Sequence, residues 1–220
     1  MSEALVSETP GETMQLLPKI AQPLRKTIFD LVLAVLLLFA LAIPLICIAV
    51  IIKCDSKGPV FFRQPRVGLN NRLFCIWKFR TMYHTMSDLH GVKLTERNDR
   101  RITRSGMWLR KWSIDEVPQI FNVLAGDMSL VGPRPHALYA GVGERLYGQI
   151  VPDYALRHAV KPGITGWAQV NGWRGETTTP MQIEQRVAHD IAYIENWSIW
   201  LDCKILLLTL KNEIRSERAF

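Results

Sequence analysis

The stretch LVLAVLLLFALAIPLICIAVII, residues 31–52, determines how the rest of the sequence is interpreted, because its 22 residues include no charged or strongly polar side chain. At about 1.5 Å per residue, a helix of this length is roughly 33 Å long and matches a bilayer hydrocarbon core of about 30 Å. Pro44 lies inside the stretch, where it provides no helical N–H and its ring crowds the carbonyl of Ala40. We therefore expect a membrane helix divided into a longer and a shorter arm.

Basic residues flank this stretch on both sides. Within 20 residues they are Lys19, Arg25 and Lys26 before it, and Lys53, Lys57, Arg63, Arg66 and Arg72 after it. Lys and Arg stay on the cytoplasmic side of a membrane, so a re-entrant helix that breaks at Pro44 and returns to its side of entry fits better than a spanning one. A kinked spanning helix is the alternative. A cleaved signal peptide fits poorly, because cleavage after residues 40–42 needs an overlong leader.

Composition excludes a disordered chain, because 48% of the residues are apolar and 21% are charged. The 27 Lys and Arg outnumber the 20 Asp and Glu, giving a net charge of +7. Such an excess indicates anionic partners: phosphates, nucleic acid or acidic lipid. Because the basic residues lie beside a membrane segment and no nucleic-acid module is recognisable, we expect no nucleic acid partner. The four cysteines and five histidines have no metal-binding spacing.

Three regions follow from these patterns. Residues 1–27 are expected to form a mobile leader, residues 28–52 the membrane helix, and residues 53–220 a helix-rich α/β, α+β-like domain on the cytoplasmic leaflet. No internal repeat is visible.

Within the last region, local patterns predict individual elements. Residues 53–72 are turn-rich, and RLFCIWKFRTM at 72–82 suits a short strand. A helix is predicted over 180–197, with Thr179, Pro180 and Gln182 as N-cap, N1 and N3 of a capping box and with a core stripe of Ile183, Val187, Ile191 and Ile194. The run at 199–211 is too short to span a membrane and is expected in a core or at the membrane interface.

The segment WLRKWSIDEVPQIFNVLAGDMSLVGPRP, residues 108–135, contains two adjacent acids, Asp115 and Glu116. Neighbouring side chains point in different directions, so we expect distinct roles for the two rather than a shared proton. One interpretation is structural: Ser113 and Glu116 match a capping box, although Pro118 would then lack a needed helical N–H. A helix that begins at Pro118 instead leaves both acids just before an N-terminus, which also attracts phosphate oxygens. The residues alone leave both interpretations open.

Many basic residues surround these acids. They are Arg97, Arg100, Arg101, Arg104, Arg110 and Lys111, with Lys78 and Arg80 before them and Arg134 after. Most of this basic run is expected on a solvated or lipid-touching face. Arg110 and Arg134 are the exceptions, since Arg134 lies in a rigid Gly-Pro-Arg-Pro turn and a guanidinium fork matches phosphate oxygens two at a time. Carboxylates beside arginines favour Mg²⁺ on phosphate oxygens. Asp127 is a further candidate ligand, although Gly-Asp is also a common turn.

A later segment, VKPGITGWAQVNGWRGE at residues 160–176, combines Gly, Trp, Gln, Asn and Arg. This composition suits a nucleotide or sugar pocket, for which Gln169, Asn171 and Arg174 are the candidates. Glycine-rich loops are common, so the segment is a weak signal by itself.

Together, four features resemble the bacterial sugar transferases known as monotopic polyprenol-phosphate phosphoglycosyl transferases. They are the proline-broken apolar segment, WKFRTM (77–82), IDEVPQIFNVLAGDMSLVGPRP (114–135) and KPGITGWAQVNG (161–172). The resemblance implies an enzyme of the bacterial inner membrane whose catalytic domain, in the cytoplasm, uses Mg²⁺ to transfer a sugar-1-phosphate from a UDP-sugar to undecaprenyl phosphate. The oligomeric state is not determined by the resemblance, and a homodimer is one alternative. Larger relatives have an N-terminal multi-helix region, so we expect this chain to be the catalytic module.

The resemblance also implies residue roles. Asp115 would attack the sugar-bearing phosphorus to give an aspartyl phosphosugar while UMP leaves, and Glu116 would help to hold Mg²⁺. Arg110 and Arg134 would bind phosphates, with Lys78 and Arg80 as supports.

Sugar identity depends on finer similarity. NGWRGET (171–177) and YIENWSIWLDCKI (193–205) are most similar to exopolysaccharide-initiating members that use UDP-glucose. UDP-galactose or a UDP-N-acetyl sugar is the alternative. One departure from many relatives is Ile43, where they have Ser before the membrane proline. A non-catalytic basic membrane adaptor is the rival class, but it gives the adjacent acids no role.

Overall fold

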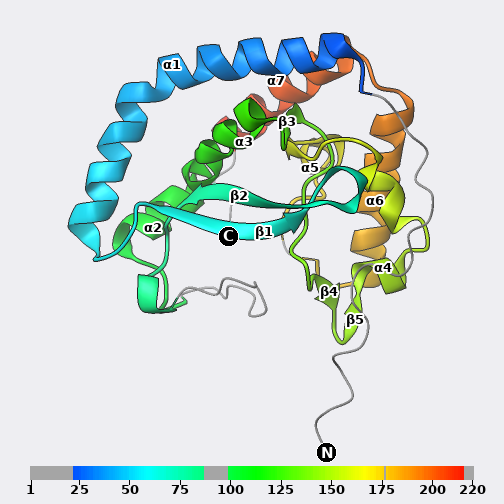
Figure 1. The fold of residues 1–220 in the computed structure, drawn as a ribbon. Helices are drawn as coiled ribbons and strands as arrows, with labels where there is room; N and C mark the ends of the chain where they lie inside the picture. The colour runs from blue at the N-terminus through cyan, green and yellow to red at the C-terminus, as the bar shows by residue number, and fades with distance from the viewer. Residues whose placement is uncertain (1–21, 87–98, 176, 216–220) are drawn as a thin grey trace, which may run out of the picture.

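The computed structural model describes residues 22–86, 99–175 and 177–215 (Figure 1). Its helices are α1 (Leu24–Asp55), α2 (Arg104–Lys111), α3 (Ile120–Ala125), α4 (Tyr147–Ile150), α5 (Trp167–Val170), α6 (Pro180–Glu195) and α7 (Ile199–Arg215). Its strands are β1 (Phe61–Val67), β2 (Leu73–Phe79), β3 (Ser129–Val131), β4 (Gly141–Val142), β5 (Arg145–Leu146) and β6 (Gly163–Thr165). Four 3-10 turns complete the set: η1 (Leu69–Asn71), η2 (His84–Met86), η3 (Ile114–Gln119) and η4 (Tyr154–Ala159). The prediction of a helix-rich domain with mixed α and β elements is confirmed.

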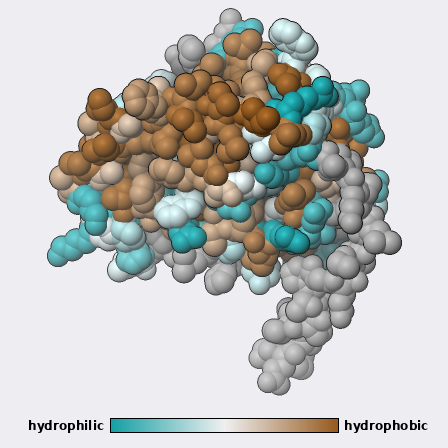
Figure 2. Space-filling view, turned by 45° about the horizontal axis from the view of Figure 1, so that its top comes forward, coloured by the Kyte–Doolittle hydropathy of each residue, from teal (hydrophilic) through white to brown (hydrophobic). Residues whose placement is uncertain are grey.

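The apolar stretch forms α1, which is helical through Pro44 and whose axis bends sharply (Figure 1). A proline inside a helix removes a hydrogen bond and bends the axis in this way. The helix is long and apolar enough to cross a membrane, and very little of its apolar window is buried in the protein. Apolar side chains form a broad band on this face of the molecule (Figure 2). Phe39 and Ile43, for example, are 87% and 76% exposed.

The helix begins at Leu24, earlier than the predicted boundary at residue 28. Residues 1–21 of the predicted leader lie outside the described residues, as does Arg97 of the basic run. The early start has a physical cause, because Lys26 is buried and ion-paired. Its Nζ lies 3.0 Å from Asp30 and 2.9 Å from Asp202. Lys26 is therefore an ion-paired, buried residue and not a free cation beside the apolar stretch.

The two acids that hold Lys26 are themselves fully engaged. Asp30 accepts hydrogen bonds from the Ser129 hydroxyl and the Leu130 backbone N–H. Asp202 accepts from the Tyr193 hydroxyl at 2.8 Å and from the Trp197 indole at 3.0 Å. This buried network joins the first turn of α1 to β3, α6 and α7, and so fixes α1 to the rest of the chain.

The prediction of a turn-rich segment over 53–72 is wrong for residues 61–67, which form β1 and pair antiparallel with β2. Pro65 lies inside β1, although proline lacks the N–H that a central strand needs. Among the described residues this sheet has two strands, so β1 is an edge strand, where a proline is tolerated. The predicted strand at 72–82 is confirmed over Leu73–Phe79.

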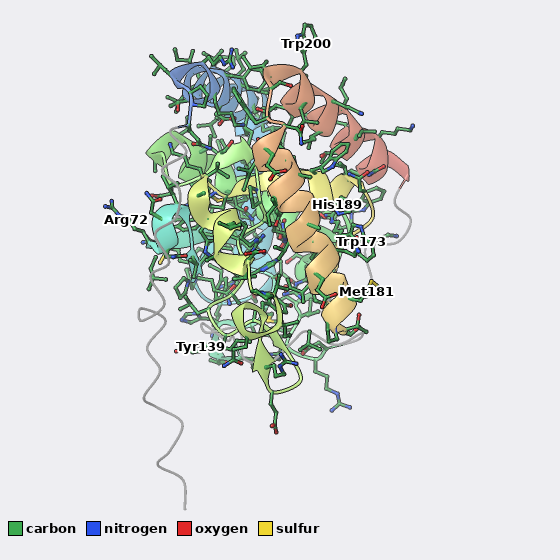
Figure 3. All side chains as sticks on the ribbon, turned by 90° about the vertical axis from the view of Figure 1, so that its right-hand side faces the viewer. Arg72, Tyr139, Trp173, Met181, His189 and Trp200 are labelled. Atoms are coloured by element: carbon green, nitrogen blue, oxygen red, sulfur yellow. The ribbon has the colours of Figure 1, made fainter. Side chains whose placement is uncertain are left out.

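The predicted helix at 180–197 is confirmed as α6, and the Gln182 side chain accepts from the Thr179 N–H as a capping box requires. Ile183 and Val187 are buried in the core. In α7, Ile205 is buried, whereas Trp200 is 84% exposed and extends away from the ribbon (Figure 3). The predicted alternatives for 199–211 are thus combined: one side of α7 packs into the core and the other exposes apolar side chains.

Two glycine-containing motifs meet through the parallel pair β3 and β6. A Cβ added at Gly163 would lie 2.1 Å from the backbone nitrogen of Gly132 and 2.5 Å from the carbonyl oxygen of Thr165. Only glycine leaves room for this approach, which places the loop that carries Arg134 directly against the segment at 161–166.

We expect Gly163→Ala to lower the free energy of unfolding by about 1–3 kcal/mol, because the two backbones must move apart. Chemical denaturation in detergent measures this change. Gly148→Ala is the control, since its Cβ would meet nothing closer than Tyr154 at 3.7 Å. Equal stability of both variants would show that the contact is unimportant.

Candidate active site

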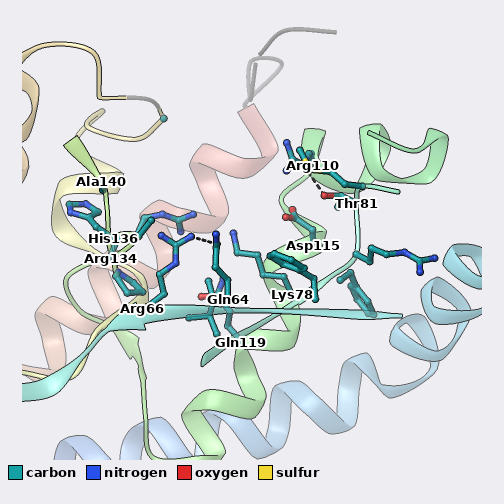
Figure 4. Close-up of a pocket in the computed structure, with 18 of the residues that line it drawn as sticks. Gln64, Arg66, Lys78, Thr81, Arg110, Asp115, Gln119, Arg134, His136 and Ala140 are labelled. Atoms are coloured by element: carbon teal, nitrogen blue, oxygen red, sulfur yellow. Dashed lines mark hydrogen bonds between the residues drawn. The ribbon is translucent and has the colours of Figure 1, made fainter. Parts of the chain in front are cut away.

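A cavity of about 370 Å³ lies between the β1–β2 hairpin, α2, η3 and the loop that follows β3 (Figure 4). Arg110, Thr81 and Asp115 lie toward one end of this cavity, and Arg66 and Arg134 toward the other. The fold thus brings an acid from one segment together with cations from three others.

Glu116 is held by two cations. Lys78 donates to Oε1 at 2.7 Å, and Arg134 donates to both carboxylate oxygens, with Nη1 at 2.8 Å from Oε2. Although burial acts in the opposite direction, Arg134 and Lys78 hold the pKa of Glu116 well below its usual range. Glu116 is therefore ionised, and its charge orients Lys78 and Arg134 at the cavity.

Asp115 has a different environment. Its side chain is buried at the cavity wall, and among the described residues no group hydrogen-bonds its carboxylate. Burial, with a contribution from Glu116, raises the pKa of Asp115 to about 6, against the opposing effect of Lys78 and Arg110. Above that pH the carboxylate is a poorly solvated anion with free oxygens, which is the condition of a nucleophile. The expectation of distinct roles for the two acids agrees with this difference.

The turn before the acids follows neither sequence interpretation. Ser113 has a φ of 52° and makes no capping bond, so the capping box is wrong. The next α-helix, α3, begins at Ile120 rather than Pro118, because the residues between form the 3-10 turn η3. The Ser113 hydroxyl instead accepts from Arg174 at 2.5 Å.

Arg110 and Arg80, both predicted to act on phosphates, have different surroundings. Arg110 lines the cavity and donates through Nε to the Thr81 hydroxyl at 2.9 Å. Arg80 is buried and donates to the carbonyls of Ser56 at 2.7 Å and Lys57 at 3.1 Å, just after α1. These bonds join the residue that follows β2 to the segment that follows α1. Arg80 also lines the cavity, so its part in supporting phosphate binding stays a prediction beside this structural role.

The three residues of the segment at 160–176 that were predicted to line a nucleotide or sugar pocket do not lie together. Gln169 and Arg174 line a second cavity of about 230 Å³, which also contacts Glu116. Asn171 is exposed and donates to the Trp167 carbonyl at 2.7 Å, so its amide closes the end of α5 and lines neither cavity.

Asp127 lies at the far end of α3 from Asp115, exposed in a turn and outside the lining of the cavity, and its role as a metal ligand stays a prediction. Over the described ranges no three His, Cys, Asp or Glu side chains form a metal cluster. Mg²⁺, however, often takes one or two carboxylates together with substrate phosphates. The free oxygens of Asp115 fit such an ion, whereas those of Glu116 already accept from Lys78 and Arg134.

Sequence reasoning missed several residues of the cavity. Arg66 and Gln64 belong to β1, which lies in the segment predicted to form turns. Arg157, which no motif marks, lies behind the cavity rather than in its lining. Arg157 is buried, pairs with Asp190 at 2.7 Å and donates to the Arg134 carbonyl at 2.6 Å. It therefore supports the Gly-Pro-Arg-Pro turn from behind. Strand alternation around Pro65 is the one signal that points to Arg66.

The site combines an ionised acid held by two cations with a second acid whose oxygens are free, near a helix suited to a membrane. These features are expected of proteins that bind phosphate esters beside a bilayer. The bacterial sugar transferase model matches residues 21–216. The chain belongs to this family, as the sequence resemblance implied.

Individual relatives extend the match. The chain is 56% identical over 197 residues to the undecaprenyl-phosphate glucose phosphotransferase of Komagataeibacter xylinus, covering 90% of this chain and 37% of that protein. It is 49% identical over 191 residues to the UDP-glucose:undecaprenyl-phosphate glucose-1-phosphate transferase of Escherichia coli (strain K12), covering 87% and 40%. It is 44% identical over 195 residues to the exopolysaccharide production protein PSS of Rhizobium leguminosarum bv. phaseoli, covering 89% and 98%. The chain thus spans about two fifths of the length of the first two relatives.

Proposed function

We propose that this protein transfers glucose-1-phosphate from UDP-glucose to undecaprenyl phosphate. The observation that carries the proposal is the unequal pair: Glu116 is paired with Lys78 and Arg134, whereas the buried carboxylate of Asp115 has free oxygens at the cavity. Relatives named for this reaction support the choice of glucose and of the prenol acceptor.

The reaction proceeds in two displacements. An oxygen of Asp115 attacks the sugar-bearing phosphorus of the donor, the bond to the bridging oxygen breaks, and UMP leaves with that electron pair. A phosphate oxygen of the acceptor then attacks the same phosphorus, and the bond to Asp115 breaks. The products are prenyl diphosphate glucose and UMP, and the carboxylate is restored. A covalent intermediate lets one cavity serve a water-soluble donor and a lipid acceptor in turn.

Electrostatics explains the cations. Two unit charges 4 Å apart repel by about 1 kcal/mol in water but by about 4 kcal/mol near a protein surface. An anionic nucleophile therefore reaches an anionic diphosphate only where cations cancel the repulsion. Lys78, Arg110 and Arg134 supply that charge here. Mg²⁺, when bound with Asp115 as a ligand, would neutralise phosphate oxygens further, and Glu116 would join it only by releasing a cation.

The membrane helix sets the depth of this cavity. We propose that α1 is re-entrant in the bacterial inner membrane, with both ends and the cavity on the cytoplasmic side. Three features support this topology: the bend of the helix, the buried attachment of its first turn through Lys26, and the hydrogen bonds that Arg80 donates to the carbonyls just after its last turn. A prenyl phosphate in the same leaflet presents its headgroup at that level.

Intact-mass measurement of the purified protein with Mg²⁺ and UDP-glucose tests the function. We expect an added mass equal to one hexose phosphate and release of UMP in the absence of acceptor. Parallel reactions with UDP-galactose and UDP-N-acetyl sugars identify the donor. If no donor yields UMP or an adduct, the proposal is wrong and the rival membrane adaptor is favoured.

A further inference from the structure

Arg66 is a cavity-lining cation that the residue roles described above do not use. Its Nη2 donates to the amide oxygen of Gln64 at 2.5 Å, and both side chains line the cavity at the end away from Arg110 (Figure 4). The backbone of Arg66 also forms an antiparallel bridge with Ala137, which follows the Arg134 turn. The bridge thus fixes the backbone of Arg66, and Gln64 orients its guanidinium.

The charge of Arg66 has no direct counter-ion among the described residues. Arg134 forms an ion pair with Glu116, whereas the partner of Arg66 is a neutral amide. Its Nε is buried without a hydrogen-bond partner, as is the hydroxyl of Thr177 in the same cavity. Burial, followed by repulsion from Arg134, lowers the pKa of Arg66 to about 10. A half-buried cation without a direct counter-ion is unfavourable, and an incoming anion relieves this cost.

The geometry of phosphoryl transfer indicates which anion belongs there. Attacking and leaving oxygens lie roughly in line through phosphorus. If Asp115 attacks from one side, the UMP phosphate leaves on the opposite side. In the second displacement Asp115 is the leaving group, so the acceptor phosphate enters where UMP left. Both positions require one subsite for a phosphate monoester, across the cavity from Asp115.

We propose that Arg66, held by Gln64, binds this phosphate monoester. The inference rests on the proposed function for its reaction geometry, and the ligand chemistry is the same whether the phosphate belongs to UMP or to the prenol. Arg66 would stabilise the second negative charge that UMP acquires as it leaves. Arg110 lies near Asp115 and interacts electrostatically with it, so it would act at the other end of the cavity.

Binding of radiolabelled UMP by equilibrium dialysis tests the inference without turnover. We expect Arg66→Met to weaken UMP binding about 10- to 100-fold, the range for a hydrogen bond between charged groups. Arg66→Lys keeps the charge but loses the forked guanidinium, so it should bind UMP with intermediate affinity. Such partial binding would show that the loss in Arg66→Met is not caused by misfolding. Arg63→Met is the matched control: it lies on the same strand, is exposed and stacks on Trp77 outside the cavity.

A second arm identifies the source of the phosphate. The KM for a short-chain prenyl phosphate in mixed micelles is measured for the same three variants, together with product inhibition by UMP. Weaker binding of UMP, of the prenyl phosphate or of both supports Arg66 as a phosphate ligand. Which of the two is weakened identifies the molecule whose phosphate Arg66 binds. If Arg66→Met matches Arg63→Met in both arms, the inference is overturned. Absence of turnover in the wild type would contradict the proposed function, but equilibrium dialysis would still test whether Arg66 binds the phosphate of UMP.

Discussion

Replacement of Asp115 by Asn should abolish the hexose phosphate adduct and lower turnover by about 10⁴-fold or more, as removal of a covalent nucleophile does. The reason is local: among the described residues Asp115 is the acid of the cavity whose oxygens are free, and an amide cannot displace UMP. Intact mass and UMP release with UDP-glucose measure the loss. Asp127→Asn is the control, because that acid lies at the opposite end of α3 and should retain nearly full activity.

The same replacement should change stability in a way that depends on pH. Burial raises the pKa of Asp115 to about 6 from an ordinary value of 3.8. Ionisation in the folded state is therefore unfavourable above about pH 6, and the cost disappears as the pH falls toward 4. Asn never ionises, so the variant should melt at a higher temperature than the wild type at pH 7.5 in metal-free buffer, with the difference shrinking at pH 4–5. A difference independent of pH would show that Asp115 is not buried in its ionised form.

Replacement of Lys26 by Met should lower the free energy of unfolding by about 3–5 kcal/mol, the range for removing one partner of a buried ion pair. The side chain of Lys26 is 1% exposed, and it balances two buried carboxylates, Asp30 and Asp202. Without it, both acids keep their neutral hydrogen-bond donors but lose their counter-charge. Chemical denaturation in detergent measures the loss, and limited proteolysis should show release of the first turns of α1.

Two further variants make this result specific. Lys53→Met removes an exposed lysine from the same helix and should be nearly neutral. Adding Asp202→Asn to Lys26→Met removes one of the two stranded charges, so it should recover part of the lost stability. If Lys26→Met and Lys53→Met are equally stable, the network does not attach the membrane helix.

Local patterns predicted much of the fold for identifiable reasons. The capping residues and apolar stripe of α6 act within a few residues of each other, so the sequence predicts that helix closely. The apolar run predicts α1, and Pro44 its bend. Prediction failed over 61–67, where β1 is stable because β2 pairs with it, and at Ser113, whose conformation depends on contacts such as Arg174. These interactions join residues that lie far apart in the chain.

The candidate site shows the same division. The sequence by itself determined the chemistry available: adjacent acids, a rigid arginine turn and a helix apolar enough for a membrane, because residue type and near-neighbour spacing set these properties. Only the tertiary structure decided which of the predicted cations meet the acids. It paired Lys78 and Arg134 with Glu116, directed Arg80 to the end of α1 and brought Arg66 to the cavity. Burial and charge pairing depend on distances in space, which is why two neighbouring carboxylates acquired opposite pKa shifts.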